Sequence, residues 1–84
     1  MTLRRKLNKE RIDDAIRACK AFYGSSGFCL CDEYMRAVKA ATDVADTHWV
    51  MDLITAVTLK NQEEPFETYY KVLEAAGLQI EGRP

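Results

Sequence analysis

The residues best suited to chemistry in this chain are its three cysteines and its single histidine, namely Cys19, Cys29, Cys31 and His48. Thiolate and imidazole groups are the ligands that zinc prefers, in a tetrahedral arrangement. The spacing does not favour such a site, because one residue separates Cys29 from Cys31 and no second close pair follows. We therefore expect neither a bound metal nor a cofactor.

A reactive thiol is the second chemical possibility. Cys31 would lie near a helix start, where the helix dipole favours the thiolate. A cysteine nucleophile also needs a base, an oxyanion hole and a substrate cleft, and nothing in the sequence brings His48 beside a thiol. Adjacent acids at 13–14, 32–33 and 63–64 come near predicted helix starts, where the dipole accounts for them. We expect capping acids, structural or interface cysteines and no enzyme.

Apolar residues recur every three or four positions along most of the chain, which predicts amphipathic helices. The fold class expected is all-α: one domain over residues 1–84, built as a compact bundle of three or four short helices with short connections. The helices are expected at about residues 8–23, 31–45, 47–60 and 65–76. No glycine or proline separates the second from the third, so residues 31–61 could instead form one long bent helix.

Local signals mark both ends of the first helix. Asn8 suits the N-cap, and Leu7 and Ile12 have the spacing of a hydrophobic staple. Asp13 and Arg17 are four residues apart, so we expect them to pair on the outer face. Gly24 is expected to stop this helix.

The fourth helix also carries start and stop signals. Pro65 suits the first helical position, because a residue there needs no amide hydrogen. Gly77 is expected to end the helix, and Leu73 and Leu78 have the spacing of a Schellman contact. The tail after it, residues 78–84, is expected to pack on the bundle and fray, or alternatively to pair as a short extended strand.

The third helix is apolar over most of its circumference. Its apolar residues include Trp49, Val50, Leu53, Ile54 and Val57. Only a narrow polar stripe remains, at positions 48, 52 and 55. Such a helix is either central or part of a subunit interface.

Charge is unevenly distributed, although the net charge is only −1. Residues 1–11 hold five bases and one acid, a local balance of +4, and residues 1–7 form a predicted basic arm. The five bases are Arg4, Arg5, Lys6, Lys9 and Arg11. They allow an alternative function, a small nucleic-acid-binding transcriptional regulator. The third helix lacks the Arg, Asn and Gln side chains that read base edges, which argues against a helix-turn-helix.

The segment Gly24 to Gly27 precedes an apolar stretch and could expose side chains for binding. The candidate partner-binding residues are Tyr23, Phe28, Leu30 and Tyr70. The leading expectation is a non-catalytic protein that binds another protein and forms a homodimer. An accessory or inhibitory role in a bacterium or phage, and a cytoplasmic location, are further expectations. No apolar run approaches the roughly 20 residues that span a bilayer, so no membrane partner is expected.

Overall fold

The computed structural model describes residues 6–23, 32–42 and 47–83. These residues form four helices, namely α1 (Lys9–Tyr23), α2 (Asp32–Thr42), α3 (His48–Lys60) and α4 (Phe66–Ala75). Two short strands accompany them, β1 (Lys6–Asn8) and β2 (Gln79–Glu81). The predicted all-α bundle is confirmed, and each described helix start lies within one residue of its predicted position. The predicted helix end at 45 lies outside the described residues.

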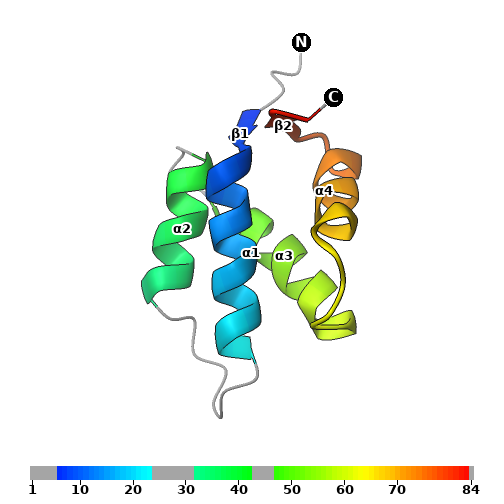
Figure 1. The fold of residues 1–84 in the computed structure, drawn as a ribbon. Helices are drawn as coiled ribbons and strands as arrows, with labels where there is room; N and C mark the ends of the chain where they lie inside the picture. Colours follow the sequence, from blue (N-terminus) through cyan, green and yellow to red (C-terminus); the bar gives the residue numbers. More distant parts are fainter. Residues whose placement is uncertain (1–5, 24–31, 43–46, 84) are drawn as a thin grey trace.

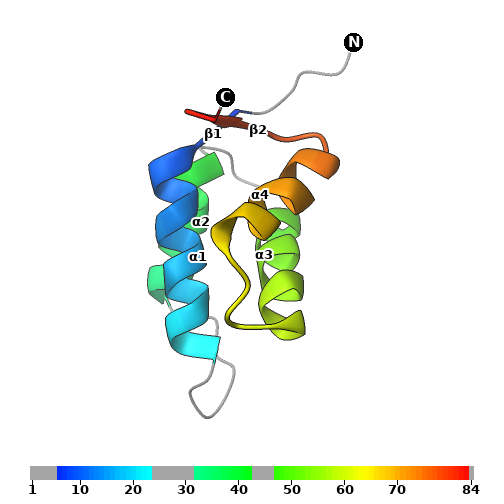
Figure 2. The ribbon, with the colours of Figure 1, turned by 45° about the vertical axis from the view of Figure 1, so that its right-hand side comes forward.

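The four helices form two antiparallel pairs. α1 descends and α2 rises beside it in Figure 1, while α3 descends and α4 rises on the other side. Figure 2 shows the two pairs side by side, with the short sheet across the end where α1 begins and α4 finishes. Because α2 and α3 run in opposite directions, residues 31–61 do not form one continuous helix.

The sheet joins the two ends of the described chain. β1 and β2 are parallel, with Lys6 opposite Gln79 and Leu7 opposite Ile80. Parallel strands need a long crossover, and all four helices supply it here. Leu7 and Ile80 are 0% and 3% exposed, since side chains alternate along a strand and these two face the core.

The strands correct two expectations about the chain ends. The predicted arm at residues 1–7 does not extend to its last two residues, because Lys6 and Leu7 belong to β1. The tail takes its alternative form as a short strand, and the expected packing on the bundle is confirmed, because Leu78 and Ile80 are both buried. Residues 1–5 and 84 lie outside the described residues, so the rest of the arm stays a prediction.

The predicted start of α1 is confirmed in its details. The Asn8 side-chain oxygen accepts a hydrogen bond from the Arg11 amide at 3.2 Å, which is the N-cap interaction with the third helical residue. Leu7 and Ile12 are both fully buried on either side of this cap. The capped start therefore fixes the angle at which β1 enters α1.

The predicted end of α4 is confirmed as well. The Leu78 amide donates to the Leu73 carbonyl at 3.2 Å, and the Gly77 amide donates to the Glu74 carbonyl at 3.0 Å. Gly77 has φ of +95°, the left-handed conformation that this Schellman motif requires. Pro65, expected as the first helical residue, instead precedes the helix with an extended ψ of 156°.

Every described element contributes to one apolar core. Its members are Leu7, Ile12, Ala15, Ile16, Cys19, Tyr34, Val38, Ala41, Val50, Met51, Ile54, Val57, Tyr69, Tyr70, Leu73, Leu78 and Ile80. The sheet therefore serves as a lid on the open end of the bundle, held by Leu7 and Ile80.

Candidate functional site

α3 divides into a buried face and an outward face. The buried residues of α3 are Val50, Met51, Ile54, Val57 and Thr58. At 3.6 residues per turn, the opposite side is centred on Ala56 and spans about 60° to either side of it. We call this side the α3 outer face, and its residues are Trp49, Asp52, Leu53, Ala56, Leu59 and Lys60.

The α3 outer face is largely apolar. Leu59 is 63% exposed, and Met35 on α2 is the other exposed large hydrophobic residue in the described part of the chain. Trp49 and Leu53 are half-buried against the edge of the core, and Ala56 is exposed. Single exposed apolar residues are normal on a protein surface. The four apolar residues of the α3 outer face follow one another at a spacing of three or four and form a continuous strip, namely Trp49, Leu53, Ala56 and Leu59. Contiguous exposed apolar surface is a feature of interaction sites.

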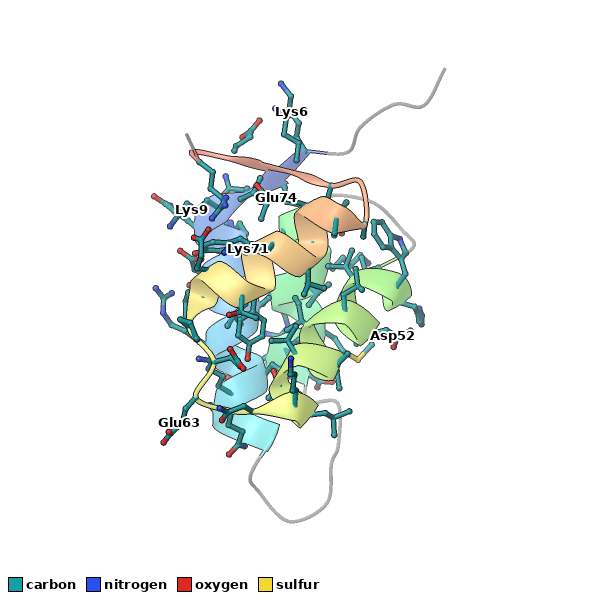
Figure 3. The ribbon with its side chains drawn as sticks, turned by 90° about the vertical axis from the view of Figure 1, so that its right-hand side faces the viewer. Lys6, Lys9, Asp52, Glu63, Lys71 and Glu74 are labelled. Atoms are coloured by element: carbon teal, nitrogen blue, oxygen red, sulfur yellow. The ribbon has the colours of Figure 1, made fainter. Side chains whose placement is uncertain are left out.

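Two charges lie on the α3 outer face beside this strip. Asp52 and Lys60 are exposed, and neither takes part in the ion pairs formed between described residues. Figure 3 shows Asp52 at the edge of the molecule, pointing away from the bundle. The expected polar stripe is confirmed at His48 and Asp52. It is wrong at Thr55, which is half-buried and hydrogen-bonded to Tyr34 at 3.1 Å.

Cys19 belongs to a buried polar chain and not to a surface site. Its thiol donates to the Thr58 hydroxyl oxygen at 3.4 Å, and Cys19 is only 2% exposed. The Thr58 hydroxyl donates to the Ile54 carbonyl at 2.9 Å and lies 2.9 Å from the Tyr69 hydroxyl. This chain fits the expected structural role of Cys19. Cys29 and Cys31 lie outside the described residues.

Three tyrosines are buried, Tyr34, Tyr69 and Tyr70. The Tyr34 hydroxyl donates to the Met51 carbonyl at 2.8 Å. Burial raises the pKa of all three phenols, because it penalises the charged form. They therefore act as neutral hydrogen-bonding groups at ordinary pH.

Tyr70, predicted as a partner-binding residue, is only 6% exposed. Its hydroxyl donates a hydrogen bond to Asp13, whose other carboxylate oxygen lies 3.0 Å from the Lys9 ammonium. The expected partner of Asp13 was wrong, since Arg17 pairs with Asp14 at 2.9 Å. Asp13 faces the bundle and joins α1 to α4, and its hydrogen bond is the main cause that raises the pKa of Lys9.

Arg83 fastens the end of the chain to α4. Its guanidinium group binds Glu67 at 2.7 and 3.0 Å and Glu74 at 2.9 and 3.1 Å. It also lies 4.8 Å from the ring centre of Tyr70. The hydrogen bond from Arg83 lowers the pKa of Glu67. These contacts join the described part of the tail to α4, and sequence spacing gave no signal for them.

The remaining predicted binding residues are only partly described. Those outside the described residues or described without a side chain are Arg4, Arg5, Tyr23, Phe28 and Leu30. Lys6 and Arg11 are exposed, and Figure 3 shows Lys6 directed away from the bundle. Lys9 is paired with Asp13, and Lys9 and Arg11, two residues apart on α1, lie on opposite sides of that helix, so the described bases do not converge on one surface.

No group of three or more His, Cys, Asp and Glu residues in the described ranges could hold a metal ion. Within the same ranges, no helix is long and apolar enough to cross a membrane. Comparison of the chain with protein-family models, with curated proteins and with solved structures gives no match. The surface itself must therefore carry any argument about function.

Proposed function

We propose that this chain is a non-catalytic protein that acts by binding another protein through the α3 outer face. The observation that carries the proposal is that Leu59 is 63% exposed on the same helix face as Trp49 and Leu53, which are half-buried. Tryptophan is enriched among the residues that carry most of the binding energy in protein interfaces. An accessory or inhibitory role for such a binder stays a prediction.

The α3 outer face is a better candidate than the other exposed apolar residue. Met35 is 41% exposed and lies in a hollow of about 350 Å³ between α2 and the start of α3. The other residues that line this hollow are all polar, namely Asp32, Arg36, Lys39, Thr47 and His48. Met35 is thus a single apolar residue among polar ones, whereas Leu59 continues a strip.

Burial of the strip contributes binding energy. Full burial of a leucine side chain contributes about 1.5–3 kcal/mol. Leu59 retains most of that surface, so its coverage by a partner contributes about 1–2 kcal/mol. The strip therefore favours association without any rearrangement of the bundle.

The proposal is tested by capture of partners from the native host on affinity-tagged protein, with quantitative mass spectrometry. Leu59→Lys should lose the proteins that wild type retains, because it places a charge in the strip. Met35→Lys is the matched control and should retain them, since it changes an isolated exposed residue. Circular dichroism checks that both variants keep wild-type helicity. Equal recovery by wild type and Leu59→Lys would refute the proposal.

A further inference from the structure

The two charges of the α3 outer face are placed symmetrically about its centre. Asp52 lies four residues before Ala56 and Lys60 lies four residues after it. At 1.5 Å per residue, each is about 6 Å from Ala56 along the helix axis. On the helical wheel they lie about 40° to opposite sides of Ala56. The face therefore carries one negative and one positive charge at equal distances from a small central residue.

This arrangement is self-complementary in one orientation only. In an antiparallel pair of α3 helices related by a two-fold axis at Ala56, every contact occurs twice. Asp52 of each copy then lies level with Lys60 of the other, within reach across the contact line, and Leu53 lies level with Leu59. A parallel pair would instead place Asp52 against Asp52 and Lys60 against Lys60, which is repulsive. The small side chain of Ala56 at the crossing point allows the 8–10 Å approach that packed helices need.

From this symmetry, and resting on the proposed role of the α3 outer face, we infer that its partner is a second copy of this chain. The two copies dock α3 against α3 in antiparallel orientation, with Ala56 on the two-fold axis. Leu53 and Leu59 of both copies flank the axis, Trp49 lies about 10 Å from it along each helix, and the Asp52–Lys60 pairs fix the register. One face of a 13-residue helix is a small interface, so the dimer is weak and reversible.

Charge reversal tests the register directly. Asp52→Lys and Lys60→Asp each create two repulsive pairs across the dimer. Each should weaken self-association by about tenfold or more. An equimolar mixture of these two variants should associate as wild type does, because every pair across the mixed dimer is again opposite in charge. The double variant should also recover, with its charges exchanged.

The measurement is molar mass by sedimentation equilibrium over a concentration series that reaches about 1 mM, a range suited to a small interface. Lys39→Asp on α2 is the matched control, since Lys39 is exposed and lies outside the α3 outer face. It should associate as wild type does. Circular dichroism confirms that each variant is folded.

Two results would overturn the inference: a wild type that stays monomeric throughout the series, or single variants that dimerise as wild type does. The capture experiment separates this failure from failure of the proposed function. If wild type is monomeric but Leu59→Lys loses a captured protein, the inference of a second copy as the partner is refuted, and the proposed binding role of the α3 outer face stands. If Leu59→Lys also loses nothing, both are refuted.

Discussion

Thr58 is the centre of the buried polar chain and offers a quantitative test of the core. Thr58 is 1% exposed, and its hydroxyl donates its single hydrogen to the Ile54 carbonyl. Its oxygen can then accept from the Tyr69 hydroxyl at 2.9 Å and from the Cys19 thiol at 3.4 Å. The hydroxyl thus uses its one donor site and both of its acceptor sites, and buried polar groups are generally hydrogen-bonded in this way.

Thr58→Val keeps the shape of the side chain and removes the hydroxyl. The Tyr69 hydroxyl, which is fully buried, then loses its partner. A buried polar group without a partner costs about 1–3 kcal/mol, so we expect Thr58→Val to lower the free energy of unfolding by about 2 kcal/mol. For a domain of this size the melting temperature should fall by about 10 °C. Tyr69→Phe in the same background removes the stranded hydroxyl, so the double variant should be no less stable than Thr58→Val.

The assay is urea denaturation followed by circular dichroism, with the midpoint and the m value fitted together. Unchanged m values show that the midpoint shifts report stability. Two results would refute the reasoning. One is a Thr58→Val change within about 0.5 kcal/mol of wild type, the level of ordinary surface substitutions. The other is a double variant that loses the sum of both single effects, because independent sites are additive.

Three further predictions concern pH, the α4 cap and nucleic acid. Folding raises the pKa of the three buried tyrosines, Tyr34 among them. Their contribution to the free energy of unfolding is therefore fully present below about pH 10, the pKa of tyrosine in the unfolded chain, and is lost as pH rises through the folded pKa. Tyrosinate absorbance should therefore appear for these three only together with loss of helical circular dichroism; their ionisation in the folded protein would contradict this. Gly77→Ala should cost about 1 kcal/mol in urea denaturation through its positive φ alone, since an added Cβ at Gly77 meets nothing within 4 Å; an unchanged midpoint would contradict the Schellman cap. On immobilised DNA at low salt, wild type and a Lys6→Ala, Arg11→Ala variant should elute alike, because the described bases do not converge; salt-sensitive retention lost in the variant would support the nucleic-acid alternative.

Signals that act within a few residues made the helices predictable. Asn8 caps the third residue after its own position, and the cap at Gly77 is completed by bonds to Leu73 and Glu74. Each interaction is fixed by local backbone geometry, and the 3–4 spacing of apolar residues gives the side that faces the core. The sequence therefore sufficed for most helix boundaries, but it left three or four helices open, because no glycine or proline separates the second helix from the third.

Contacts between the ends of the chain could not be predicted in the same way. β1 and β2 have three residues each, too few for alternation to distinguish a strand from a frayed end, and their pairing depends on where four helices place them. The contact of Asp13 with Tyr70 on α4 could not be predicted for the same reason, because Asp13 lies among acids that are typical of a helix start. Spacing along one helix does not give the partner on another.

The α3 outer face was only partly predictable. The sequence indicated that α3 has more apolar surface than one buried side needs. It did not indicate which side the other helices would cover, and that choice decides whether Leu59 is core or surface. Leu59 is exposed because α1, α2 and α4 all pack on the side of Ile54, which is 0% exposed.

The most direct test of the central claim is a cysteine at the proposed two-fold axis. In the antiparallel register, Ala56→Cys places two thiols opposite one another across the dimer. A disulfide needs a Cα separation of about 4.4–6.8 Å, and closely packed helices bring two residues on the axis into this range. Mild oxidation should convert Ala56→Cys to a covalent dimer on a non-reducing gel far faster than wild type or Ala40→Cys, an exposed position on α2. Equal rates of cross-linking for Ala56→Cys and Ala40→Cys would contradict the account.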